Sequence, residues 1–261
     1  MTGVGDIDTY PPNGPEAVRS TQLKAIIFDY YETLVELSGN MRAQAFDQFA
    51  SKVGVDLPAG EPYRHWREQT TRDPALRFGG SERPPLDGPT PPFRTFREVW
   101  LTRFRELFDH WGVDAPAEVG ADAYRDWHVE ADLYRDARTA LAMLRKADGA
   151  LRLAVLSDAD HDFLAANLRR NGLRFDAVVS SEEVRVYKPH DSIFHHTCAR
   201  LGVAPEEAMY VGDSPWADVA GARNAGLRAV WLNRRDTPWP DDIEPPNESV
   251  SAITGLLDLA R

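Results

Sequence analysis

Short apolar runs alternate with segments of helical periodicity along most of the chain. Five runs are almost wholly apolar, as expected for strands that are covered on both faces. They lie at residues 23–28, 151–156, 175–180, 208–212 and 228–232. Apolar residues at helical spacing predict helices at residues 161–172, 191–202 and 215–226, and a last one at residues 247–261. This alternation predicts an α/β fold built on a doubly wound parallel sheet.

The interval between the first two predicted strands departs from this alternation. Residues 38–133 contain no convincing strand, but apolar residues recur at helical spacing at residues 41–55, 61–72, 93–113 and 121–134. We therefore expect an all-helical lid, inserted into a core formed by residues 22–37 and 134–261. Four aromatic residues of the lid are expected to form its interior, although an interaction surface is the alternative: Trp66, Trp100, Tyr124 and Trp127.

Composition and charge narrow the classes of function. The net charge of −11 argues against a nucleic-acid or anionic membrane partner, because such a surface would repel the chain. No apolar stretch approaches the roughly 20 residues that span a bilayer. Residues 1–21 are rich in Gly, Pro and Asp and predict a disordered tail without a secretory signal. A single cysteine, Cys198, cannot form an internal disulfide, so a cytoplasmic location is expected.

Polar residues with chemical potential follow the predicted strands. Asp29 follows the first strand, Ser157 the second, and Asp213 closes the fourth, with Asp218 five residues later. Lys188 lies in the loop after the third strand and is one of only four lysines in a chain rich in arginine. In an open parallel sheet, ligands bind beyond the carboxyl ends of the strands. We therefore expect carboxylates, a hydroxyl and an ammonium group to converge on one site.

Four ordered motifs, FDYYETL, LSDAD, VYKP and GDSPWAD, resemble those of the haloacid dehalogenase superfamily of hydrolases. The predicted lid resembles that superfamily's helical cap, inserted after the first motif. The resemblance covers nearly all of residues 22–260, and the last motif, together with the Lys-Pro pair about 25 residues before it, is its most specific part.

The resemblance implies a role for each of these residues. Asp29 would be the nucleophile of a covalent aspartyl intermediate, and Lys188 would keep it ionised. Thr33 and Ser157 would hydrogen-bond the phosphoryl oxygens or the nucleophile. The resemblance also implies Mg²⁺ as cofactor, because carboxylate and carbonyl oxygens suit this hard cation. Its expected ligands are Asp29, the backbone carbonyl of Tyr31, Asp213 and, directly or through water, Asp218.

Tyr31 departs from the pattern of most phosphatases of this superfamily, which carry aspartate at that position. Its backbone can still bind a metal ion, but a phenol with a pKa of about 10 is a poor proton donor to a leaving group near neutral pH. Glu32 is a candidate replacement acid, although adjacent side chains diverge. The Asp-x-Tyr-x-Thr pattern resembles the 2-haloacid dehalogenases, in which halide leaves without a proton and no metal is used.

Two features favour a phosphatase over a dehalogenase. Asp213 retains the acid needed for Mg²⁺, where the dehalogenases have a Ser-x-Asn arrangement without metal. Asp158 stands where dehalogenases have asparagine, and its charge would disfavour a carboxylate substrate unless a metal ion or an arginine offsets it. The expected function is therefore Mg²⁺-dependent hydrolysis of a small phosphorylated metabolite, an anionic substrate. A dehalogenase, or a catalytically weak member that binds a ligand or partner, are the alternatives.

Several points stay open at the level of sequence. Specificity would come from lid side chains that face Asp29, and the candidates are Arg64, His65, Trp66 and Arg67, the last in a segment similar to the halide-binding segment of dehalogenases. Lys52 is the only lid lysine and is interpreted as a solvated helix residue. The sequence does not distinguish a monomer from a homodimer.

Overall fold

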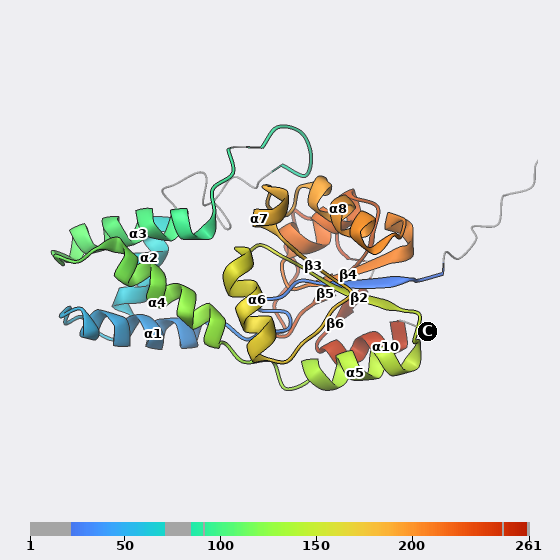
Figure 1. Cartoon of the computed structure of the whole chain (residues 1–261), viewed down its shortest axis with the longest axis horizontal. Coiled ribbons are helices and arrows are strands. Elements are labelled where there is room, and N and C mark those ends of the chain that lie inside the picture. The colour runs from blue at the N-terminus through green and yellow to red at the C-terminus, as the bar shows by residue number, and fades with distance from the viewer. Residues whose placement is uncertain (1–21, 71–84, 91, 247, 260–261) are drawn as a thin grey trace, which may run out of the picture.

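Parallel strands form one twisted sheet at the centre of the molecule (Figure 1). The structure is a computed structural model that describes residues 22–70, 85–90, 92–246 and 248–259. Within these residues the sheet has six strands in the order β3-β2-β1-β4-β5-β6. The strands are β1 Ala25–Phe28, β2 Arg152–Ser157, β3 Ala177–Ser180, β4 Ala208–Gly212, β5 Arg228–Leu232 and β6 Glu248–Val250. The predicted tail of residues 1–21 lies outside the described residues.

The two faces of the sheet are covered by different helices, which confirms the doubly wound α/β prediction (Figure 1). In β1, Ile26 and Phe28 enter one hydrophobic core, whereas Ala25 and Ile27 enter the other, as the alternation of a strand requires. Helices α5 (Ala137–Ala147), α6 (His161–Arg170) and α10 (Leu256–Leu259) pack on the first face. On the second face lie α8 (Asp191–Leu201), α9 (Gly221–Asn224) and the π-helical turn Pro215–Ala220. Short helices also occur at α7 (Ser181–Val184), Pro205–Glu207 and Ile253–Gly255.

The carboxyl-terminal segment corrects one prediction. The sequence pattern predicts a helix over residues 247–261. In the part of this segment that the structure describes, residues 248–259, Glu248–Val250 form the edge strand β6 and Leu256–Leu259 form an α-helix. Three residues are too few for an alternation of apolar and polar side chains to be recognised in the sequence. The strand β6 is held by its pairing with β5 and by an ion pair between Glu248 and Arg228. The structure also contains α5 and α7, which the sequence pattern did not single out.

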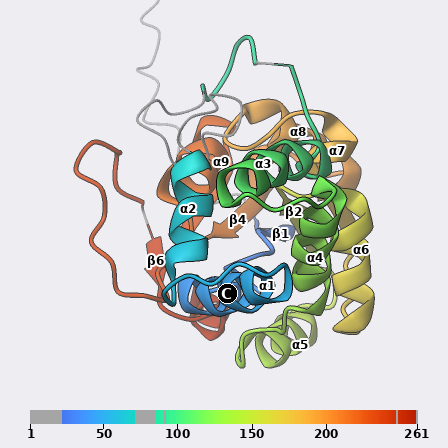
Figure 2. The same ribbon diagram turned by 90° about the vertical axis from the view of Figure 1, so that its left-hand side faces the viewer.

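Four helices between β1 and α5 gather at one end of the molecule, beside the sheet (Figures 1 and 2). They are α1 (Gly39–Lys52), α2 (Glu61–Thr70), α3 (Phe96–Trp111) and α4 (Ala117–Glu130). Their aromatic side chains pack on one another: the Trp66 ring lies tilted against those of Phe104 and Phe46, with centroid distances of 4.5 Å and 5.2 Å. Trp66 and Trp100 are both buried, which agrees with an interior role for these aromatics.

The helical segment is attached to the sheet by specific contacts. The carboxylate of Asp160, at the end of the loop after β2, accepts hydrogen bonds from the N–H groups of Phe96 and Arg97 at 2.8 Å each. These are the first two residues of α3, whose N–H groups have no partner within the helix. Helix α4 packs along α6, as both views show (Figures 1 and 2). None of the described helices combines the length and apolarity needed to cross a membrane.

Candidate active site

The carboxyl end of β1 brings Asp29 to the edge of the sheet where its two neighbours, β2 and β4, also end. The backbone N–H of Asp29 donates to the carbonyl oxygen of Val211 at 2.9 Å, which continues the pairing of β1 with β4. Ser157 is the last residue of β2, and Asp213 directly follows the last residue of β4. Parallel strands in register therefore place these residues side by side.

Lys188 is buried at this edge and its ammonium group has three partners. Its Nζ donates to Asp29 Oδ1 at 2.7 Å, to Asp218 Oδ1 at 2.6 Å and to the Tyr210 hydroxyl at 3.1 Å. Three contacts satisfy all three N–H groups of the ammonium. Burial alone would lower the pKa of Lys188, but the carboxylates of Asp218 and Asp29 outweigh this and hold the pKa well above its ordinary value. The lysine is therefore charged and fixed in place.

Three carboxylates meet around this ammonium. Asp29, Asp213 and Asp218 each present an oxygen, and these oxygens all lie within 4.8 Å of one another. Burial raises the pKa of Asp29 to about 6, because the lowering effect of Lys188 is smaller and Asp218 adds to the rise. Burial, together with the charges of Asp218 and Asp29, also raises the pKa of Asp213 well above its ordinary value. Three acids against one ammonium leave an excess of negative charge.

This oxygen cluster fits a hard divalent cation. Carboxylate oxygens are the ligands that Mg²⁺ prefers, and a cation would offset the repulsion that raises the pKa of Asp213. Asp213 is half-buried, whereas Asp29 and Asp218 are buried. The residues present therefore suit the ion that the sequence implied.

Both carboxylate oxygens of Asp218 accept hydrogen bonds from the surrounding protein. Its Oδ1 lies 3.1 Å from the Tyr210 hydroxyl in addition to Lys188, and its Oδ2 accepts the N–H of Ser214 at 2.9 Å. Gly212 permits this approach, since a Cβ there would lie 2.3 Å from the Asp218 carboxyl carbon. Asp218 thus orients Lys188 through Oδ1, and its Oδ2 can also face a cation.

Tyr210 and Asp158 complete the surroundings of Lys188. The sequence analysis expected Asp158 near the pocket but gave it no partner, and it did not assign Tyr210 to the site. Tyr210 lies in β4, where its ring fits the apolar pattern of the strand. The pattern therefore gives no sign that its hydroxyl contacts Lys188. Asp158 Oδ1 accepts the backbone N–H of Lys188 at 3.1 Å, and burial raises the pKa of this carboxyl to about 7. An acid directly after Ser157 was the only sequence signal for the latter.

Thr33 and Ser157 are both buried. Thr33 is close to Asp29 in the chain, and Ser157 ends β2 at the same edge of the sheet. Within the described residues, the Thr33 hydroxyl oxygen has no hydrogen-bond partner. A buried hydroxyl without a partner is costly unless a ligand satisfies it.

The side chain of Tyr31 does not join the carboxylates. Its hydroxyl donates to the carbonyl oxygen of His128 in α4 at 3.4 Å, and its ring packs edge-on against Tyr30 and His128. Burial raises the pKa of this phenol further above its ordinary value. Glu32 is engaged too, since its carboxylate pairs with Arg42 and Arg235. Neither side chain therefore stands as a proton donor beside Asp29.

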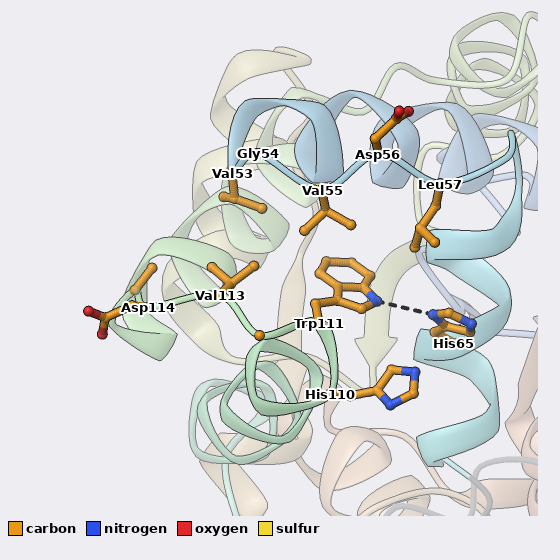
Figure 3. Close-up of a pocket in the computed structure, with 12 residues that line it drawn as sticks. Val53, Gly54, Val55, Asp56, Leu57, His65, His110, Trp111, Val113 and Asp114 are labelled. Carbon is orange, nitrogen blue, oxygen red and sulfur yellow. Dashed lines mark hydrogen bonds between the residues drawn. The ribbon is translucent and has the colours of Figure 1, made fainter.

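The four lid residues proposed for specificity have other surroundings. Trp66 is buried in the aromatic core, and Arg64 pairs with Glu61 and Glu68 on its own helix. His65 accepts a hydrogen bond from Trp111 Nε1 at 3.0 Å, beside a cavity of about 600 Å³ between the end of α1 and the end of α3 (Figure 3). Arg67 is exposed on α2.

Comparisons with known proteins agree with this geometry. A family model described as haloacid dehalogenase-like hydrolase matches residues 23–226. The phosphoserine phosphatase of Thermus thermophilus is 36% identical over 155 residues, which are 56% of this chain and 61% of that protein. The (S)-2-haloacid dehalogenase 4A of Burkholderia cepacia is 31% identical over 109 residues, or 41% of this chain and 47% of the relative. The chain thus spans less than two thirds of the length of these relatives.

Solved structures extend the likeness to the whole fold. The HAD-hydrolase YfnB of Bacillus subtilis, in a crystal structure bound to magnesium, superposes with a TM-score of 0.71. The match covers 92% of this chain and 99% of that one, at 21% sequence identity. At this identity, the likeness concerns the fold alone.

Proposed function

The chain belongs to the haloacid dehalogenase-like hydrolases, and from this premise we propose that it hydrolyses the phosphate monoester of a small metabolite, with Asp29 as nucleophile and Mg²⁺ as cofactor. We further propose that residues 38–133 act as a cap over a core of residues 22–37 and 134–261. A cytoplasmic enzyme would fit the single buried cysteine, Cys198, whose pKa burial raises to about 11.

The observation that carries this proposal is the half-buried carboxylate of Asp213 beside those of Asp29 and Asp218. Asp29, Asp213, the backbone carbonyl of Tyr31 and, directly or through water, Asp218 would hold the ion. When bound, Mg²⁺ would neutralise phosphoryl and carboxylate charge and so let two anions approach. A substrate that brings no phosphate would not need so much positive charge.

Asp29 would then displace the ester group in line. One of its carboxylate oxygens forms a bond to phosphorus while the ester P–O bond breaks, and the electron pair leaves with the ester oxygen. Lys188 keeps Asp29 ionised and offsets charge beside it. The hydroxyls of Thr33 and Ser157 would donate to phosphoryl oxygens. Water then attacks phosphorus, which releases inorganic phosphate, restores the Asp29 carboxylate and gives its proton to solvent or phosphate.

The departing oxygen must take its proton from water in this arrangement, because the Tyr31 hydroxyl is directed at His128 and Glu32 is paired with two arginines. Phosphate esters of acidic alcohols should therefore react faster than alkyl phosphates, because an acidic alcohol can leave as its anion without a proton. A positioned general acid is typically worth 10² to 10⁴-fold, so the difference should be of that order.

A dehalogenase is the second candidate, favoured by the Asp-x-Tyr-x-Thr pattern and by dehalogenases among the relatives. The two candidates are separated by assaying p-nitrophenyl phosphate with Mg²⁺ or with EDTA, and 2-chloropropionate with EDTA. We expect phosphate release that requires Mg²⁺ and no chloride release. Chloride release without metal would overturn the phosphatase proposal. Binding of phosphate esters without either activity would favour the third candidate, a ligand-binding member.

A further inference from the structure

Arg42 extends from α1 toward the loop that carries Asp29. Its Nη2 lies 3.4 Å from the Glu32 Oε1, and Glu32 is three residues after Asp29. The Arg42 side chain keeps 28% of its surface exposed, although its Nε is buried. Burial would lower the pKa of Arg42, but Tyr124, Glu32 and Tyr63 outweigh this and raise it. The guanidinium therefore stands between the helical segment and the edge of the sheet.

One nitrogen of this guanidinium lacks an acceptor in the part of the chain that the structure describes. The Nε of Arg42 is buried and has no hydrogen-bond partner among the described residues. The N–H groups of Nε and Nη2 point in parallel along one edge. Nη2 makes the long contact with Glu32, and the guanidinium also interacts with the Tyr63 side chain. A carboxylate or phosphate with two oxygens matches such an edge bidentately. A buried N–H without an acceptor is costly, so binding of such an anion would remove that cost.

The surrounding charge favours an anion. Arg235, from the loop after β5, pairs with the same Glu32 carboxylate, so two guanidinium groups share one acid. His128 adds no charge near neutral pH, because burial, with a smaller contribution from Arg42, lowers its pKa to about 4. Glu32 and Arg235 also line a cavity of about 110 Å³ together with Asp213. The excess positive charge thus adjoins the carboxylate cluster.

We propose that Arg42 binds a second anionic group of the substrate, a carboxylate or a second phosphate, at the end remote from the phosphoryl group that Asp29 attacks. This inference rests on the proposed phosphatase function and narrows its substrate class to phosphorylated metabolites that carry a second, distal acidic group. Arg42 was not among the lid residues that the sequence suggested for specificity.

The test uses pairs of compounds that differ in the distal acid alone. Phosphoserine is compared with phosphoethanolamine for the carboxylate, and fructose 1,6-bisphosphate with fructose 6-phosphate for the second phosphate. Dissociation constants are measured by calorimetry in Mg²⁺ on the Asp29→Asn variant, which holds the ligand without turnover, and kcat/KM on the chain with Asp29 intact. One pair should differ by about 10- to 100-fold in favour of the distal acid, the range expected of hydrogen bonds to a charged group.

Substitutions of Arg42 test whether this residue causes the difference between the paired compounds. Arg42→Gln should reduce this difference to less than about threefold, and Arg42→Lys should restore part of it, because an ammonium keeps the charge but loses the bidentate edge. Arg64→Gln, in the neighbouring helix and paired with Glu61 and Glu68, is the matched control and should keep the full difference. Thermal melting checks that each variant is folded.

The outcomes separate the two proposals. Turnover of p-nitrophenyl phosphate without discrimination in either pair, or discrimination that survives Arg42→Gln, overturns the role of Arg42 alone. If no phosphate ester binds and none is hydrolysed, the phosphatase function fails, and the Arg42 site fails with it.

Discussion

At the scale of single residues, Asp29 and Lys188 are buried beside one another, so the ionisation of one depends on the other. The ordinary pKa of aspartate, 3.8, is raised to about 6 at Asp29 because burial outweighs the attraction of Lys188. In the metal-free protein the Asp29 carboxyl should therefore titrate near pH 6 in a carbon-13 NMR titration. Lys188→Met removes the cation that lowers this pKa, and the titration should move to higher pH. An unchanged midpoint in that variant would contradict the assigned coupling.

Tyr31 allows a second prediction at this scale. The hydroxyl of Tyr31 donates to the His128 carbonyl oxygen over a long distance of 3.4 Å, so this hydrogen bond is weak. Tyr31→Phe should therefore lose little stability and keep the aromatic packing. We expect kcat on p-nitrophenyl phosphate and on an alkyl phosphate to stay within about threefold of the parent, since general acid catalysis would be worth at least 10²-fold. A selective fall on the alkyl phosphate would instead identify this phenol as the proton donor.

At the scale of elements, Asp160 links the loop after β2 to the first turn of α3. Asp160→Ala would leave the N–H groups of Phe96 and Arg97 without their acceptor, at an expected cost of about 1–3 kcal/mol in the free energy of unfolding. Urea denaturation measures this loss, and amide exchange should be accelerated at the start of α3.

The matched control is Asp162→Ala, two residues away. Asp162 is exposed and pairs with Arg125 of α4 at 2.6 Å, so its loss should cost no more than about 1 kcal/mol. Equal destabilisation by the two variants would show that Asp160 contributes no more than a surface ion pair.

Sequence pattern predicted the elements that are long or wholly buried. Continuous apolar runs located β1 to β5, and helical spacing located α1 to α4, α6 and α8. It missed β6, whose three residues are held by pairing with β5, and it extended a helix through residues that form that strand. Helical spacing also located residues 215–226, but it did not predict that the first part, Pro215–Ala220, is a π-helical turn.

At the scale of the whole molecule, the position of the site followed from strand order. Asp29, Asp213 and Asp218 approach one another because β1 and β4 are neighbours, and a parallel sheet could be anticipated from alternation alone. The directions of individual side chains could not be anticipated from the sequence. Tyr31 turns toward α4, and Arg42 reaches Glu32 from α1, through packing between the helical segment and the sheet that one-dimensional spacing does not encode.

The central claim is that the Asp29 carboxylate attacks phosphorus, and trapping the covalent intermediate tests it most directly. The protein is mixed with p-nitrophenyl phosphate and Mg²⁺, quenched in acid during turnover, and mapped by peptide mass spectrometry. We predict a phosphoryl group on the peptide that contains Asp29, and neither adduct nor hydrolysis in Asp29→Asn. Hydrolysis that persists in Asp29→Asn, or a phosphoryl group on a different residue, would contradict the claim.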